Sequence, residues 1–411
     1  MSKARDTAKL LSMLSVYRGI RNNNVIGAFY KLLCSLDEEQ TVFLENWGHF
    51  FDLLTNEGYS TDLALCLTSA ALYDENSFSK AAAAGKSDNI NSFEKTAIKN
   101  DIHTIILASE LTAHDIVNDY KYKEELGSLA YSLPTWGIGK PVSEFSDEDN
   151  AFERLSEFYR KNGFGIYAGY KAFIWRSGFI VPVTYPDTVS VDDLIGYSFQ
   201  RDEVIKNTEA FLKGVPGNNV LLYGDRGTGK SSTIKAILNK YSKDGLRMVE
   251  MPKEDLCDFP LLVEQIAGIP LKFIIFIDDL SFNNDDLSYA RLKAVLEGGL
   301  AARPDNTLIY ATSNRRHLIK ESFSDREGDD MHINDTVQET LSLFDRFGLA
   351  VNFSKPDKDT YLEIVTGLAD KNIKSYDKEK LIRDAERWAI ARGGRSPRCA
   401  KQFISNIMSE M

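Results

Sequence analysis

The fold of this chain is decided by the stretch Gly224-Asp225-Arg226-Gly227-Thr228-Gly229-Lys230-Ser231. The stretch fits the phosphate-binding loop pattern Gly-x-x-x-x-Gly-Lys-Ser without a mismatch. An apolar run over residues 219–223 precedes it and predicts a buried strand, and residues 232–240 after it predict a helix. A chance glycine turn would not be expected to have both flanking elements. The sequence therefore predicts the strand–loop–helix unit on which a P-loop α/β fold is built.

Each part of this loop has a role in holding a phosphate chain. Glycines let backbone N–H groups turn inward around a phosphate, and the start of the following helix adds positive partial charge. Lys230 can reach the β- and γ-phosphate oxygens, and the Ser231 hydroxyl can bind magnesium. The predicted nucleotide-binding residues are Gly224, Asp225, Arg226, Gly227, Thr228, Gly229, Lys230, Ser231 and Ser232. The ligands predicted from this loop are ATP and Mg²⁺.

A second group of polar residues follows two later apolar strands. Residues 273–277 form an apolar run that ends in Asp278 and Asp279, and residues 308–313 form another that ends in Asn314. A carboxylate at a strand tip beside the phosphate loop can bind magnesium, and we assign this role to Asp278. We expect Asp279 to orient or deprotonate the attacking water, and Asn314 to hold that water or sense the γ-phosphate. Asp and Asn are also common in ordinary turns, so the prediction depends on the order in which these residues follow the loop along the chain.

Length and composition indicate an ordered chain of more than one domain. The 411 residues are enough for two or three domains, and the 43% hydrophobic content allows a sizeable core. Residues 1–10 carry charge and no long apolar run, which predicts no secretory signal. The apolar stretch 173–183 is interrupted by Arg176 and is too short to cross a bilayer. We expect a cytoplasmic protein that does not enter a membrane.

Neither the cysteines nor the histidines show the spacing of metal ligands. The cysteines are Cys34, Cys66, Cys257 and Cys399, and the histidines are His49, His103, His114, His317 and His332. Widely separated cysteines without a Cys-x-x-Cys pair are typical of the reduced cytoplasm. We therefore expect neither a zinc site nor a framework of disulfides.

The net charge of −11 is distributed unevenly along the chain. Residues 1–195 contain 18 basic and 27 acidic residues, a net charge of −9, whereas the rest contain 31 and 33, a net charge of −2. An acidic N-terminal half repels a phosphate backbone, although such charge also serves simple solubility. Nucleic acid is therefore disfavoured as a partner of the N-terminal half.

The pattern along the chain predicts four parts. Residues 1–160 show apolar residues at three- and four-residue spacing, which predicts a mostly helical N-terminal domain. Residues 161–190 form an aromatic-rich connecting segment, in which 170–175 and 178–183 could be two short strands. Strands and helices then alternate over residues 191–355, which is typical of a parallel sheet. Residues 356–411 show three helical patterns and are expected to form a C-terminal lid.

The order of these motifs resembles that of the AAA+ ATPases. The resemblance covers residues 191–411 and implies a P-loop parallel sheet with a helical lid. It also implies that Arg346, in Leu343-Phe344-Asp345-Arg346-Phe347-Gly348, is an arginine finger that reaches the γ-phosphate on a neighbouring subunit. Ile195 and Gly196 match the family's segment beside the adenine. Arg398, in Gly394-Arg395-Ser396-Pro397-Arg398, matches the lid sensor best, with Arg395 as the alternative.

Several stretches also look like an uncharacterised bacterial AAA+ family of predicted ATP-binding proteins, for which no substrate is assigned. They include Ala311-Thr312-Ser313-Asn314-Arg315-Arg316-His317-Leu318 and Asp345-Arg346-Phe347-Gly348-Leu349. The chain departs from most AAA+ proteins at Asp279, where they have the longer glutamate, so slow or partner-stimulated hydrolysis is expected. It also has no glycine in residues 252–260, where unfoldases place an aromatic–apolar–glycine pore loop.

Three functions follow from this interpretation. The first is a homo-oligomeric ATPase, a ring or a filament, that hydrolyses Mg-ATP between subunits and remodels or loads a partner, with a protein bound through the N-terminal half. The second is a slow nucleotide-dependent switch that binds and releases a protein. The third is a DNA-dependent ATPase, suggested by the basic cluster Arg303, Arg315, Arg316 and His317 and disfavoured by the acidic N-terminal half.

Overall fold

The computed structural model describes residues 2–56, 58, 61–280, 291–293, 295–296, 304–314 and 346–410. The chain divides into two compact units, Met1–Gly169 and Tyr170–Met411. Each unit has its own hydrophobic core, and each is described by itself.

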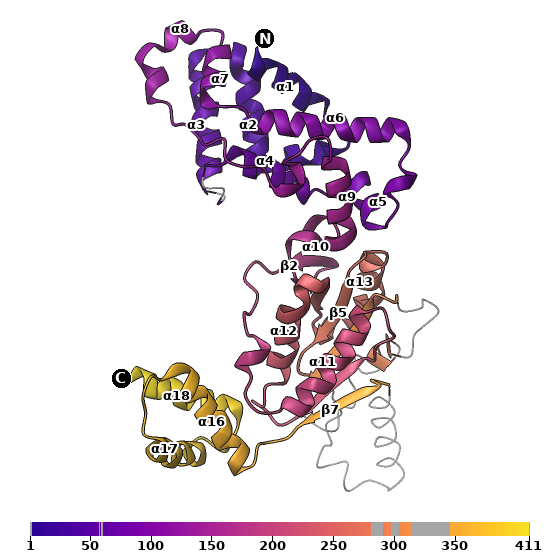
Figure 1. Cartoon of the computed structure of the whole chain (residues 1–411), viewed down its shortest axis with the longest axis vertical. Coiled ribbons are helices and arrows are strands. Elements are labelled where there is room, and N and C mark those ends of the chain that lie inside the picture. Colours follow the sequence, from indigo (N-terminus) through magenta and orange to yellow (C-terminus); the bar gives the residue numbers. More distant parts are fainter. Residues whose placement is uncertain are drawn as a thin grey trace. The chain divides into compact units, whose positions relative to one another are not determined.

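The named elements in the described part of the N-terminal unit are helices, which agrees with its three- and four-residue apolar spacing (Figure 1). Its α-helices are α1 (Lys3–Met13), α2 (Asn24–Cys34), α3 (Gln40–Asn56), α4 (Leu63–Leu72), α5 (Ser77–Ala83), α6 (Ser92–Ser109), α7 (Ala113–Asp119), α8 (Lys123–Leu126), α9 (Ala151–Asn162) and α10 (Gly165–Gly169). Short 3-10 segments separate several of them. Large aromatic side chains fill the core: Trp47 lies 5.2 Å from Trp136, and Phe43 stacks on Tyr120 at 4.0 Å, both between ring centroids.

A buried carboxylate ties α6 to the turn after α1. Asp101 is 4% exposed and accepts backbone N–H bonds from Ser15 at 3.0 Å, Val16 at 2.7 Å and Tyr17 at 2.9 Å. These N–H groups precede or begin a 3-10 helix, so they have no partner within that helix. A single charged side chain thus satisfies three donors that burial would otherwise leave unpaired.

The C-terminal unit is built on a seven-stranded sheet whose order is β2-β1-β4-β5-β6-β3-β7. The strands are β1 (Ala172–Arg176), β2 (Phe179–Pro182), β3 (Val220–Gly224), β4 (Leu246–Glu250), β5 (Lys272–Ile277), β6 (Thr307–Ser313) and β7 (Leu349–Phe353). Among the described strands, only β2 pairs antiparallel, with β1, and the other pairings are parallel. The fold class predicted from the sequence, an α/β P-loop parallel sheet with helical additions, is confirmed.

Helices cover the sheet, and separate helices after β7 form the lid (Figure 1). In the described part of the unit, the helices around the sheet are α11 (Ser198–Leu212), α12 (Lys230–Tyr241) and α13 (Phe259–Ile266). Apolar side chains of α11 and α12 share one core with side chains from one face of the sheet, including Leu222, Phe276 and Tyr310. Residues of β6 are buried without exception, as is typical of parallel strands covered on both faces.

The three helical patterns predicted after residue 356 are three helices with their own small core: α16 (Lys358–Asn372), α17 (Lys378–Ala391) and α18 (Pro397–Ser409). Each begins at a side chain that accepts backbone N–H bonds of its first turn. These caps are Asp357, Asp377 and Ser396. Proline at the first position of α18 adds to the same signal.

The segment expected to connect the two halves contributes to the sheet. Residues 161–190 include β1 and β2, which extend the parallel sheet beyond β4. The indole N–H of Trp175 on β1 donates to the carboxylate of Asp258 at 3.1 Å, and Trp175 is buried. Of the aromatic residues of this segment, Phe173 and Trp175 on β1 are buried, whereas Phe179 and Tyr185 are exposed, at 70% and 92%.

Candidate functional site

The phosphate loop lies between β3 and α12, and three of its glycines have positive φ. The φ of Gly224 is 126°, and a Cβ there would lie 2.4 Å from the carbonyl oxygen of Phe353 on the adjacent strand. Gly227 has a φ of 75°, and Gly229, with a φ of 96°, caps α12. Residues that have a side chain rarely adopt these backbone conformations, so the loop needs glycine in order to turn here. The turn is fixed further by Thr228, whose hydroxyl donates to the carbonyl of Asp225 at 2.9 Å.

The ammonium group of Lys230 lies at the centre of the site and uses all three of its donors. It donates to the carbonyls of Gly224 at 3.0 Å and Asp225 at 2.7 Å, and to Oδ1 of Asn314 at 3.0 Å. Burial lowers the pKa of Lys230, and the nearby carboxylates of Asp225, Asp279 and Asp278 act in the opposite direction. The lysine is thereby held at the loop, with its charge beside the phosphate-binding backbone.

Asp278 collects three hydrogen bonds at the end of β5. Its Oδ1 accepts from the Ser231 hydroxyl at 2.7 Å, from the backbone N–H of Asp279 at 3.1 Å, and from the Thr312 hydroxyl. Ser231 lies in the first turn of α12 and Thr312 lies on β6, so three elements meet at one carboxylate oxygen. A hydroxyl and a carboxylate side by side offer the oxygen ligands that Mg²⁺, a hard cation, prefers. Within the described residues no cluster of three or more histidine, cysteine or acidic side chains forms a metal site.

Asp279 has a left-handed backbone and a fixed carboxylate. Its φ is 51°, which is uncommon for a residue with a side chain. Its N–H donates to Thr312 Oγ1 at 2.9 Å, and its carboxylate accepts from Asn314 Nδ2 at 2.6 Å. Asn314 therefore joins Lys230 through its oxygen to Asp279 through its nitrogen. The predicted loop lysine, the second acid and the strand-end amide thus form one connected network.

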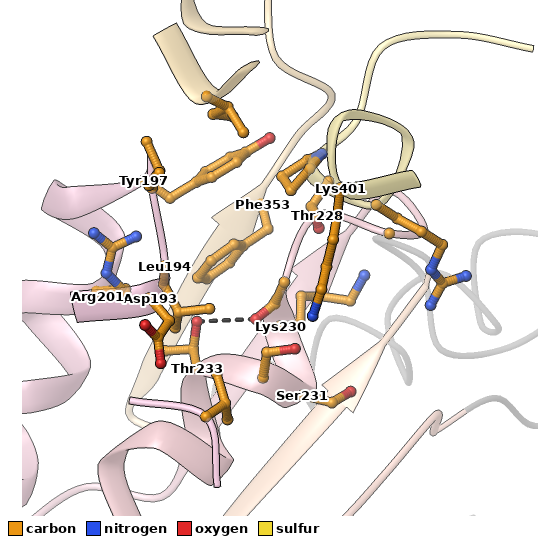
Figure 2. Close-up of a pocket in the computed structure, with 18 of the residues that line it drawn as sticks. Asp193, Leu194, Tyr197, Arg201, Thr228, Lys230, Ser231, Thr233, Phe353 and Lys401 are labelled. Atoms are coloured by element: carbon orange, nitrogen blue, oxygen red, sulfur yellow. Dashed lines mark hydrogen bonds between the residues drawn. The ribbon is translucent and has the colours of Figure 1, made fainter. Parts of the chain in front are cut away.

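A cavity of about 1170 Å³ extends from this network toward the lid. Its apolar wall includes Leu194, Ile195, Tyr197, Phe353 and Ile364. The rings of Tyr197 and Phe353 stack at 5.3 Å between centroids, and Figure 2 shows them together on one side of the cavity. The Tyr197 hydroxyl donates to the carbonyl of Ser354 at 2.6 Å, and burial, with the nearby Asp225 and Asp357 carboxylates, raises its pKa to about 12. An apolar wall opposite a phosphate loop is the surface that a nucleobase needs.

The segment beside this wall packs on the lid. Gly196 has a φ of 77°, and a Cβ there would lie 3.0 Å from the side chain of Ile364 on α16. A Cβ on Gly367 of the same helix would lie 2.9 Å from Ile195. Both positions need glycine, because a Cβ there would come too close to the side chain of the facing segment. Residues 194–197 therefore contact the lid as well as the cavity.

The lid also contacts the phosphate loop directly. The N–H of Arg398, in the first turn of α18, donates to the carbonyl of Gly227 at 3.1 Å, and Arg398 lines the cavity. Arg395 forms a bidentate pair with Glu386 on α17, with nitrogen–oxygen distances of 3.0 and 2.8 Å. This hydrogen-bonded pairing lowers the pKa of Glu386 and raises that of Arg395. Of the two sensor candidates, Arg398 lines the large cavity and Arg395 is paired within the lid.

Arg346 lies away from this site within its own chain. It stands three residues before β7, whose Leu349 pairs with Val220, whereas Phe353 pairs with Gly224 at the start of the loop. Four residues of strand, about 13 Å, separate those two ends. Arg346 is not among the residues that line the large cavity. The basic residues Arg303, Arg315, Arg316 and His317 lie outside the described residues.

Two residues of the site were not predicted. Thr312 is 2% exposed and connects Asp278 to Asp279, and Phe353 supplies the ring on which Tyr197 stacks. Strand alternation offered a signal for Thr312, because it lies two residues before Asn314 and therefore on the same side of β6. The sheet order that brings Phe353 beside the loop is a long-range pairing that no local pattern indicates. No helix among the described residues is long and apolar enough to span a membrane.

The loop after β3, the acids after β5 and the amide after β6 define a P-loop protein of the AAA+ superfamily. The sequence profile of a family described as protein of unknown function (DUF815) matches residues 168–411, and the chain belongs to this family. The proteasome-activating nucleotidase of Methanococcus vannielii is 30% identical over 203 residues, which cover 44% of this chain and 45% of that protein. That of Methanococcus maripaludis strain C7 is 28% identical over 229 residues, which cover 49% and 51%.

The chain thus spans about half the length of the curated relatives it matches. Among solved structures, the RuvB Holliday junction branch migration motor of Thermotoga maritima is similar, with 18% sequence identity and a TM-score of 0.37. The match covers 54% of this chain and 64% of that one.

Proposed function

We propose that the chain binds Mg-ATP and hydrolyses it at interfaces between copies of itself, in order to remodel or load a macromolecular partner. One observation carries the proposal: Asn314 bonds both Lys230 and Asp279, while Ser231 and Thr312 bond Asp278. These residues, to which the proposal gives the roles that phosphoryl transfer requires, thus lie together at the tip of one sheet. The similarity to nucleotidases supports the reaction class.

In this proposal Lys230 binds the β- and γ-phosphate oxygens, and Ser231 with Asp278 holds magnesium. Bound magnesium would supply positive charge to the phosphate oxygens. Asp279 orients the attacking water and accepts its proton, and Asn314 fixes the carboxylate of Asp279. Because Asp279 is fixed both through its backbone N–H and through its carboxylate, its position costs little further ordering during the reaction.

Arg346 is proposed to act on the nucleotide of a neighbouring copy. Its place before β7, about one strand length from its own loop, supports a role in trans. Arginine fingers contribute on the order of 10³ to 10⁵ in rate. Contacts of this head-to-tail kind produce rings or filaments, so we propose a homo-oligomer. Arg398 is proposed as the lid residue that senses the phosphates, since it lines the large cavity.

The segment after β4 helps to distinguish threading of a polypeptide from remodelling or loading of a partner. Residues 253–258 form a 3-10 helix that leads into α13, and Leu256 and Phe259 are buried. Asp258 is bonded to Trp175. An aromatic side chain packed in this way is not presented to a polypeptide substrate. We therefore propose remodelling or loading of a partner rather than threading, with the acidic N-terminal unit as the part that binds a protein.

A slow nucleotide-dependent switch is the second candidate, and the Asp279–Asn314 bond favours it. At 2.6 Å this bond restricts the rotation of the Asp279 carboxylate, whose side chain is one methylene shorter than that of glutamate. In the first candidate this bond positions the base for reaction, whereas in the switch it would hold the carboxylate away from the water, so turnover would stay slow until a partner moves Asn314. Turnover far below about 1 s⁻¹, even in the assembled state, would support the switch.

The test is steady-state ATP hydrolysis as a function of protein concentration, beside a Lys230→Ala control. Specific activity that rises with concentration and disappears in the control would support a site shared between copies. Low activity that does not change with concentration, together with tight magnesium-dependent ATP binding, would contradict the shared site and favour the switch. Nucleic acid added at low salt tests the DNA-dependent alternative in the same assay, because stimulation would have to appear there.

A further inference from the structure

A second cavity, of about 500 Å³, lies beside the phosphate loop. Its lining includes five basic residues and one acidic residue: Arg226, Lys355, Arg392, Arg395, Arg398 and Asp225. These basic residues come from three separate segments: the loop itself, the connection between β7 and α16, and the turn between α17 and α18 together with the first turn of α18. This excess of positive charge is unexpected in a chain with a net charge of −11.

Most of these cations have no acidic partner in the described part of the chain. Only Arg395 forms an ion pair there, with Glu386 at 2.8 Å. The Asp225 carboxylate accepts the backbone N–H of Lys355 at 2.8 Å rather than its ammonium. Arg392 lies over the ring of Trp388, at 4.5 Å from its centroid. Like charges that converge on one cavity repel one another, and a bound anion would relieve that repulsion.

The backbone adds to this positive field. Helix α18 begins at the cavity, with Ser396 as its cap, and its N-terminus carries positive partial charge. Gly393 and Gly394 have φ values of 84° and 130°, and a Cβ on Gly394 would lie 3.6 Å from the ammonium of Lys355. The glycines therefore allow the turn to bend close beside a cation. Side-chain charge and helix terminus meet at the same cavity.

The chemistry of the lining selects one class of ligand. Among the described residues that line the cavity none is aromatic or a branched aliphatic, so it offers no surface for a nucleobase or an acyl chain. Guanidinium groups bind the oxygens of phosphate groups through paired N–H donors. We propose that this cavity is a second anion site, which binds a phosphate-type oxyanion beside the nucleotide.

The site adjoins the proposed reaction. Arg226, Asn314 and Arg398 line both this cavity and the larger one. Inorganic phosphate, the product that ATP hydrolysis releases, is therefore the nearest source of such an anion; this assignment of the source rests on the proposed function. A phosphate group on another molecule is the other source, and it would enter from solvent.

The test is calorimetric titration of inorganic phosphate and of pyrophosphate into full-length Lys230→Ala, which separates the second site from hydrolysis. Adding Lys355→Gln and Arg392→Gln should weaken binding at least tenfold. The matched control is Arg387→Gln, an exposed arginine on α17 outside the cavity, which should leave binding unchanged. Equal binding in both variants, with unchanged thermal unfolding, would overturn the site. Binding of an acidic peptide without binding of either phosphate would overturn the ligand class.

A second measurement assigns the source. Added inorganic phosphate should slow ATP hydrolysis by the otherwise unmodified chain and have at least tenfold less effect on Lys355→Gln with Arg392→Gln. If phosphate binds in the calorimeter yet leaves turnover unchanged, the product role is overturned while the site stands. If the chain hydrolyses no ATP at all, the proposed function fails, and the calorimetric result still decides the anion site.

Discussion

Replacing Thr312 by valine tests whether one buried hydroxyl holds the two acids of the site. Thr312 is 2% exposed, and its hydroxyl donates to Asp278 and accepts the Asp279 N–H at 2.9 Å. Valine has nearly the same shape but makes neither bond. The change therefore removes two hydrogen bonds without opening a cavity.

The magnitude follows from the partners that remain. In the valine variant Asp278 Oδ1 still accepts a hydrogen bond from the Ser231 hydroxyl at 2.7 Å. The Asp279 N–H still donates to Asp278 Oδ1 at 3.1 Å, so neither group is left without a hydrogen-bond partner. The bond from Thr312 to a charged acceptor is worth about 1.5–3 kcal/mol. We expect the free energy of unfolding to fall by about that amount. If the transition state loses the same stabilisation, kcat falls roughly 10- to 150-fold.

The assay is ATP turnover titrated with Mg²⁺, beside thermal unfolding. The valine variant should need more Mg²⁺ for half-maximal activity, because one side of the Asp278 carboxylate is released. Thr312→Ser is the control, since it keeps the hydroxyl and should retain most of the activity. A valine variant with normal turnover and a normal Mg²⁺ requirement would refute the positioning role, whatever its stability.

The remaining predictions concern the finger, the lid, the lysine and the loop. Arg346→Ala should bind ATP normally and hydrolyse none, and normal turnover would exclude a finger in trans. Arg398→Ala should weaken ATP binding or turnover at least tenfold, whereas Arg395→Ala should mainly lower the thermal stability of the lid. If Arg395→Ala were instead the variant that weakens ATP binding in a titration, Arg395 would be the lid sensor and Arg398 would not. Because burial lowers the pKa of Lys230 below 10.5, ATP affinity should fall as the pH rises through that lowered value, and Lys230→Arg, which keeps its charge, should shift the fall to higher pH in equilibrium titrations. Gly224→Ala, whose Cβ would lie 2.4 Å from a backbone oxygen, should destabilise the unit by about 1–3 kcal/mol in thermal unfolding, and an unchanged melting temperature would contradict the strain.

Local patterns were sufficient to predict the elements around the phosphate loop. Residues 219–223 and 232–240 were expected as strand and helix, and the structure has β3 and α12 at these places. The lid helices were predicted from their helical patterns, and in the structure each begins at a capping side chain. These signals depend on a few neighbouring residues, which is why they can be seen in sequence.

The features that the sequence did not predict depend on contacts between distant segments. The hairpin of β1 and β2 was seen as two possible strands, but its pairing with β4 could not be predicted from either segment. The left-handed backbone of Asp279 is stabilised by Thr312, 33 residues away. The Arg395–Glu386 pair required the turn between α17 and α18 to be known. The chemical roles of the site residues stay predictions until turnover is measured.

The strand β1 is anchored as soon as it begins. The carbonyl of Lys171 accepts the N–H of Met248 on β4 at 3.0 Å, and β1 is then held along its length by hydrogen-bond ladders to β2 and β4. A force applied to the chain at this point would act along the strand, so the hydrogen bonds of both ladders would resist it together. The sheet that bears such a force is the one that holds the phosphate loop.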